Sequence, residues 1–135
     1  MGFRRFYYLF SLIFVFVAPS VFEWRYVQTH ISATNLAAFI VGITVIGSLW
    51  DIWATRHGRE DAVWLWQFNR KCTLGLTFFD LPIEEYVFYV ATSVYVIFEW
   101  TLINDPSIAP LWIVPLTTIW SLFFIGLPYV FQPKN

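Results

Sequence analysis

The stretch Asp80-Leu81-Pro82-Ile83-Glu84-Glu85-Tyr86 decides the fold, because it leads directly into residues 87–98, none of which is charged. Proline suits the first turn of a helix, where its missing N–H leaves no hydrogen bond unmade. Asp80 can cap that turn, and acidic side chains there meet the positive end of the helix dipole. The stretch therefore predicts the start of a membrane helix with two adjacent carboxyl groups at its mouth.

Glu84 and Glu85 have two interpretations. They can simply be the charged, well-capped start of a helix. Alternatively, they are functional, because ionisable residues at a bilayer boundary are candidates for a functional site by default. Both interpretations stay open at this point.

The composition predicts an integral membrane protein. The 135 residues are 59% apolar and 22% aromatic, and only 13% are charged, whereas soluble domains carry roughly 25% charged residues. The length fits a single all-α domain over 1–135, a bundle of three to four transmembrane helices of roughly 20 residues each.

Several classes of function are disfavoured. The net charge of −1 argues against a nucleic-acid partner. The single cysteine excludes an internal disulfide and a thiolate metal cluster, and the two histidines lie far apart, so we expect no metal site. The six glycines form no dinucleotide or phosphate-binding motif, so we expect no bound cofactor.

Four apolar runs are separated by polar segments. A short polar segment, 23–32, follows the first run. The longer segment 54–71 mixes charged residues with aromatic and apolar ones, as an interfacial helix or lid would. Thr34 or Asn35 can cap the second helix, in which Gly42 and Gly47 permit close packing. The expected spans are 6–22, kinked or ended near Pro19, then 36–52, 82–102 and, if it spans, 108–131.

The basic residues predict the orientation, because they gather on the cytoplasmic side of membrane proteins. With four spans and a cytoplasmic N-terminus, Arg25 alone lies outside in a multi-pass protein of the cell membrane. The inner side then holds Arg4, Arg5, Arg56, Arg59, Arg70, Lys71 and Lys134. This orientation brings Asp51, near the end of the second helix, to the level of Glu84 and Glu85.

Aromatic residues are concentrated at the same level. They can form an ordinary interfacial belt or a π-rich pocket that stabilises a carbocation beside the acids. The residues concerned are Trp50, Trp53, Trp64, Trp66, Phe68, Phe78, Phe79, Tyr86, Phe88 and Tyr89.

Three motifs together carry a family resemblance: Trp50-Asp51, Trp66-Gln67-Phe68-Asn69 and Leu81-Pro82-Ile83-Glu84-Glu85-Tyr86-Val87-Phe88. In this order they resemble the lycopene cyclase domain of the small membrane-embedded carotenoid cyclases, which are heterodimeric in bacteria and fused in archaea and fungi. The family's Pro-x-Glu-Glu element matches Pro82 to Glu85, with Ile83 in place of the more usual leucine. The resemblance covers about 6–100 and leaves the run 108–131 unmatched.

The resemblance implies acid-catalysed, non-redox ring closure of a linear carotenoid. It implies Glu84 or Glu85 as the proton donor, the other as base or cation stabiliser, and Asp51 in support. Burial and a neighbouring carboxyl group both favour the protonated form that such a donor needs. The implied partners are the carotenoid, the bilayer and a second homologous cyclase subunit. The implied substrate-binding residues are Trp50, Trp66, Phe68, Asn69, Phe79, Pro82, Phe88 and Tyr89.

Two alternatives remain open. One is a non-catalytic carotenoid-binding or assembly subunit, in which the glutamates serve only topology and capping. The other is a carotenoid end-group hydratase, which would use the same acid and quench the cation with water. Glu99, about 21 Å along the helix from Glu85, is expected to reach the outer headgroups.

Overall fold

The computed structural model describes residues 3–57 and 73–130, so the predicted substrate contacts Trp66, Phe68 and Asn69 lie outside the described residues. The predicted interfacial segment is also mostly outside them. In chain order the elements are η1 (Phe3–Phe6), α1 (Tyr7–Leu12), η2 (Ile13–Val17), α2 (Ala18–Val27), α3 (Ala33–His57), β1 (Thr77–Phe78), β2 (Leu81–Pro82), α4 (Ile83–Asn104) and α5 (Ile113–Val130).

The prediction of an all-α membrane bundle is confirmed. Three helical stretches in the described part are long and apolar enough to cross a membrane: Tyr7–Val27, Ala33–Arg56 and Ile83–Asn104. Beside them α5 contributes the shorter apolar stretch Ile113–Gly126. Its start follows Pro110, and Pro115 falls in its first turn, where the missing N–H leaves nothing unpaired.

The first span was predicted to be kinked or to end near Pro19, and the second of these alternatives was wrong, because the helical stretch runs from Tyr7 to Val27. The chain stays helical to Val27 because η2 is a π-helical turn, in which Ala18 N–H donates to the carbonyl of Ile13, five residues earlier. Pro19 follows inside this continuous helix and has no N–H to donate, and the carbonyls of Phe14 and Val15, five and four residues earlier, accept the Trp120 ring N–H at 2.8 Å and the Ser121 hydroxyl at 2.7 Å. The predicted polar segment after this span accordingly shrinks, and Glu23 lies inside the helix.

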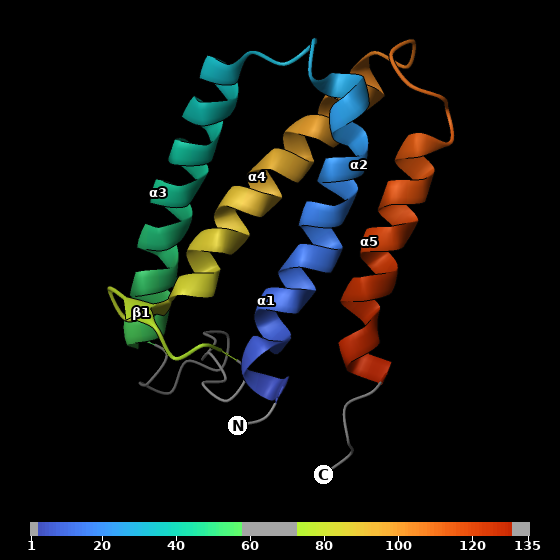
Figure 1. Ribbon diagram of the computed structural model, residues 1–135. Coiled ribbons are helices and arrows are strands. Elements are labelled where there is room, and N and C mark those ends of the chain that lie inside the picture. The colour runs from blue at the N-terminus through green and yellow to red at the C-terminus, as the bar shows by residue number, and fades with distance from the viewer. Residues whose placement is uncertain (1–2, 58–72, 131–135) are drawn as a thin grey trace.

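Helix α4 occupies the centre of the bundle (Figure 1). It packs against α3 on one side and against the rod formed by α1, η2 and α2 on the other, and it also contacts α5. Where α2, α4 and α5 meet, Val27, Phe98, Leu102 and Ile113 form the apolar core. At the opposite end, η1, the end of α3 and the β1–β2 hairpin lie together (Figure 1).

Helix α3 is longer than predicted at both ends. Neither predicted cap, Thr34 or Asn35, precedes it; instead Ser32 Oγ accepts a hydrogen bond from Asn35 N–H at 3.3 Å. The extension at the other end places Asp51 inside the helix rather than at its end, with the side chain 6% exposed. Much of the rest of α3 is bare apolar surface, as expected for a helix that faces lipid.

A tight hairpin leads the chain into α4. Phe78 pairs with Leu81, so Phe79 and Asp80 form a two-residue turn with φ of 50° and 66°. Such turns need positive φ at both positions, which aspartate tolerates far better than phenylalanine. The prediction that Asp80 caps α4 was wrong, because its side chain points to Arg56, 3.4 Å away, while Pro82 occupies the N-cap position.

Candidate functional site

A carboxyl pair lies between three helices at the start of α4. The Glu85 side chain accepts a hydrogen bond from the Tyr8 hydroxyl of α1, and Asp51 of α3 accepts one from the Tyr89 hydroxyl. The two carboxyl groups also face each other at hydrogen-bonding range. Glu85 and Asp51 are only 5% and 6% exposed. The predicted meeting of Asp51 with the start of α4 is thus present, and Tyr8 joins it.

The Asp51 and Glu85 carboxyl groups can bond to each other only through a proton. An ionised carboxylate only accepts hydrogen bonds, so two of them can bond to each other only when one is protonated. Two like charges side by side in an apolar bundle would also repel strongly. The arrangement can therefore store one acidic proton between Asp51 and Glu85, with a tyrosine hydroxyl donating to each acid.

Glu84 has a different environment from Glu85. It is fully buried, and its Oε1 accepts a hydrogen bond at 2.5 Å from the backbone N–H of Leu74. A second bond, from Ile83 N–H to the carbonyl of Leu76 at 2.9 Å, ties the same segment to the helix start. Glu84 Oε2 has no hydrogen-bond partner within the described ranges. Its visible role is to fasten residues 74–76 to α4.

Gly47 makes room for Tyr89. A methyl group added at Gly47 would lie 2.5 Å from the Tyr89 ring, closer than carbon atoms approach one another. The ring therefore packs against the α3 backbone, where its hydroxyl is 2.9 Å from the Gly47 carbonyl and also reaches Asp51. The predicted close packing at Gly47 is confirmed, whereas nothing approaches Gly42 within 4 Å.

The predicted aromatic pocket does not assemble as a whole around the acids. Tyr89 contacts Asp51, the Phe88 ring lies beside the Tyr89 ring with centroids 5.7 Å apart, and Pro82 is buried at the helix start. Trp50 and Phe79, in contrast, are 51% and 60% exposed and face outward. Their prediction as lining residues came from depth in the membrane, and depth does not say which side of a helix a residue occupies.

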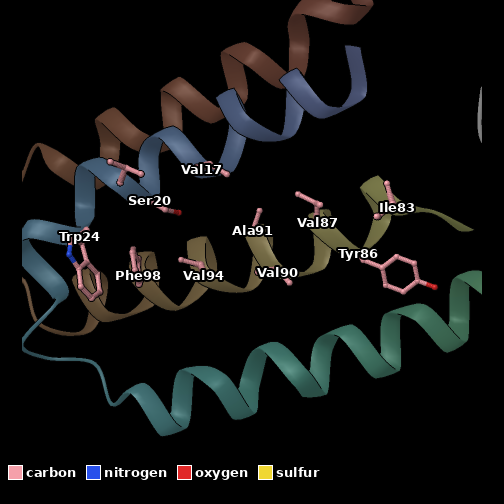
Figure 2. Close-up of a pocket in the computed structure, with 11 residues that line it drawn as sticks. Val17, Ser20, Trp24, Ile83, Tyr86, Val87, Val90, Ala91, Val94 and Phe98 are labelled. Carbon is pink, nitrogen blue, oxygen red and sulfur yellow. The ribbon is translucent and has the colours of Figure 1, made fainter. Parts of the chain in front are cut away.

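A groove of about 620 Å³ runs between α2 and α4 (Figure 2). It begins near Ile83 and Tyr86, continues past Val90 and Val94, and ends where Trp24 stacks on Phe98 with ring centroids 5.8 Å apart. These positions span about 22 Å along α4. The lining is apolar apart from Ser20 and Tyr86, and it contains none of the carboxyl groups of Asp51, Glu84 and Glu85.

Glu99 does not reach the outer headgroups, so that prediction was wrong. Its side chain is 8% exposed and accepts a hydrogen bond at 2.5 Å from the hydroxyl of Thr117 in α5. Glu23 of α2, which is fully buried, faces the same carboxyl group. Glu85 and Glu99 are fourteen residues apart, a whole number of heptads, and this spacing could have indicated that both face into the bundle.

Two further residues of these sites were missed from the sequence. Tyr8 looked like one of many aromatics in the first span, and no spacing relates it to Glu85 across 77 residues. Glu23 was assigned to the polar segment 23–32 because the first apolar run ends at Phe22. Had the helix been continued, Ser20, Glu23 and Val27 would have fallen at i, i+3 and i+7 on one face.

No family model, curated protein or solved structure matches the chain.

Proposed function

We propose that the chain is a carotenoid cyclase, or one subunit of a heterodimeric cyclase, that closes a ring at the end of a linear carotenoid by acid catalysis. The observation that supports this most is the Asp51–Glu85 pair, held in an apolar bundle by Tyr8 and Tyr89. Such a pair keeps a carboxylic acid protonated, which protonation of a carbon–carbon double bond demands.

Glu85 is the better candidate for the proton donor. It faces a second carboxyl group, whereas Glu84 is engaged by the backbone N–H of Leu74. Glu84 therefore positions the helix start, and in the proposed reaction it is the candidate for the base or cation stabiliser.

The reaction needs only proton transfer. The Glu85 proton adds to the terminal double bond, and the resulting tertiary cation takes up the electron pair of the neighbouring double bond, which forms the ring bond. Loss of a proton from the carbon beside the new cation restores a double bond. The product is an isomer of the substrate, and the acid is regenerated once a base, such as the Asp51–Glu85 carboxylate, takes up a proton.

The α2–α4 groove supports a long apolar substrate, because its length and lining suit a polyene. The groove lining includes Ile83, one residue before Glu84. The Glu85 carboxyl group, however, faces α1 and α3 and not the groove. A second, homologous subunit packed on this bundle would complete the path between groove and acid. The orientation with a cytoplasmic N-terminus, in the cell membrane, rests on the basic residues alone.

The test is pigment analysis in lycopene-producing cells that co-express the chain with a homologous partner subunit. The wild type is expected to yield cyclic carotenoids of unchanged mass. Glu85→Gln is expected to lower ring formation by at least about 100-fold, since a general acid contributes about 10²–10⁴-fold. Glu84→Gln is expected to retain part of the activity.

The control is Asp105→Asn, which removes an exposed carboxylate and should leave ring formation unchanged. Full activity of Glu85→Gln, with the variant present in the membrane at the wild-type level, would refute the assignment of this acid. Pigment that stays acyclic with every partner would refute the cyclase itself.

The groove favours a second candidate, a subunit that holds a carotenoid without reacting with it. Because the groove lining lacks the acids, a polyene bound there would keep its end groups. Purified protein would then carry acyclic pigment, and Val90→Trp, which fills the middle of the groove, would remove it. A product heavier by one water would indicate hydration instead of either role.

A further inference from the structure

The second carboxyl pair, Glu23 and Glu99, belongs to no part of the proposed reaction. Glu23 is fully buried, and neither of its oxygens has a hydrogen-bond partner of good geometry among the described residues. Burial of an unpaired charge in an apolar bundle is very unfavourable. The Glu23 carboxyl group therefore needs a proton or a cation between it and the carboxyl group that it faces.

That group is Glu99, which is already fixed in place. Its Oε1 accepts the Thr117 hydroxyl at 2.5 Å, and the Tyr95 hydroxyl lies beside it together with Ser121 of α5. Ser121 in turn donates to the carbonyl of Val15 at 2.7 Å. Glu99 therefore accepts a hydroxyl at hydrogen-bonding distance, whereas Thr117 only lies near Glu23 and neither Glu23 oxygen has a hydrogen bond of good geometry among the described residues.

Basic side chains of this end of the bundle are directed elsewhere. The Arg25 guanidinium lies over the rings of Phe22 and Tyr26, at 5.5 and 5.8 Å from their centroids. His30 is in the loop near Asp105. In the described ranges no three metal-ligating side chains come together, so the pair is not part of a larger metal-type cluster.

We propose that Glu23 and Glu99 form a proton-binding site that holds one exchangeable proton between their carboxyl groups. Glu23 carries the proton and donates it to Glu99, which keeps the charge that Thr117 and Tyr95 stabilise. This satisfies a Glu23 oxygen and halves the buried charge. Each end of α4 then has its own acid pair, and this second site does not rest on the carotenoid chemistry.

The test is infrared spectroscopy of the purified full chain, labelled with ¹³C in the glutamate carboxyl groups. A protonated carboxyl group shows a carbonyl stretch that a carboxylate lacks, and the label separates glutamate from aspartate. At neutral pH, Glu23→Gln is expected to remove the intensity of about one protonated group per chain, because Glu23 carries the shared proton. Glu99→Gln is expected to keep that intensity and shift its frequency, because Glu23, buried without its partner, stays protonated. Asp105→Asn, which changes the net charge equally, is the control and should remove none.

A variant that keeps both acids tests the proposal even if the glutamine variants misfold. Thr117→Val is expected to retain the intensity and shift the frequency, because Glu99 loses its donor and pulls harder on the shared proton. An unchanged spectrum in both glutamine variants would overturn the proposal. So would thermal stability that rises with Na⁺ relative to choline at equal ionic strength, which would indicate a bound metal cation instead of a proton.

Discussion

The two ends of α4 hold carboxyl pairs that differ in how fully they are hydrogen-bonded. At the start, Asp51 and Glu85 each accept a tyrosine hydroxyl, from Tyr89 and Tyr8 respectively. At the other end Glu99 accepts Thr117, but Glu23 has no partner of good geometry within the described chain. The first pair is supported on both sides, whereas the second is supported on one.

This difference indicates different roles. A donor on each acid holds both carboxyl groups in fixed positions, as an acid that must meet a substrate requires. In the second pair only Glu99 accepts a hydroxyl group with good geometry, so the shared proton is the main link between Glu23 and Glu99. The following predictions contrast the two pairs, from the largest expected effect to the smallest.

The largest effect is expected from leucine in place of one acid at each site. Asp51→Leu leaves the buried Glu85 without its partner and should lower the free energy of unfolding by about 1–3 kcal/mol. Glu23→Leu should destabilise less, because Glu99 keeps the Thr117 hydroxyl and no other hydroxyl loses its acceptor, whereas Asp51→Leu also removes the acceptor of the Tyr89 hydroxyl. Unfolding in detergent micelles measures both, and destabilisation by Glu23→Leu as large as that by Asp51→Leu would contradict the contrast.

Gly47→Ala tests how the first pair is held. The added methyl group would push the Tyr89 ring away from α3 and its hydroxyl away from Asp51. Overpacking of this kind costs about 1–3 kcal/mol, to be measured as the free energy of unfolding. Gly42→Ala is the matched control on the same helix, because nothing lies within 4 Å of the added group. Equal stability of the two variants would show that Tyr89 does not rest on Gly47.

Removal of one hydroxyl donor from each pair should have a smaller effect. Tyr89→Phe deprives Asp51 of a donor and Thr117→Val deprives Glu99 of one. Hydrogen bonds to charged groups contribute about 1.5–3 kcal/mol and neutral ones about 0.5–1.5 kcal/mol. Because Glu85 and Glu23 hold the protons, Asp51 and Glu99 each carry the charge of their pair, so the two variants should destabilise by similar amounts in the same unfolding measurement. A clearly smaller effect of one variant would show that its acid is the protonated member of the pair.

The sequence was sufficient for the helical class and for part of the first site. Hydropathy identifies the spans because each needs a long apolar run, and the orientation from basic residues brings Asp51 to the depth of Glu85. The sequence did not predict how each helix is rotated about its own axis. Trp50 is next to Asp51 in the chain, yet one faces outward and the other inward, since successive residues differ by about 100°.

The second site could not be predicted because it depends on a backbone irregularity. The π turn over Ile13–Val17 lets the first span continue through Pro19, and only then does Glu23 turn inward. The apolar run ends at Phe22 and polar residues follow it, so the sequence favoured a boundary before Glu23, whereas the helix continues to Val27. The Glu99 environment was missed for a related reason, since its partners Glu23 and Thr117 lie on two other helices.

Asp105 provides the exposed carboxylate against which the buried pairs can be compared, and its predicted effect is the smallest. The Ser107 hydroxyl and, at 3.2 Å, the Ser107 backbone N–H donate to it, and these bonds lower the pKa of Asp105. A lowered pKa in the folded state adds stability above the unfolded-state value, which is lost as the pH falls through the folded-state pKa. Ser107→Ala should therefore raise the pKa of Asp105 and weaken the loss of stability on acidification. Unfolding measured from neutral to acidic pH tests this, and because solvent screens an exposed group, a change as large as that of Thr117→Val would contradict it.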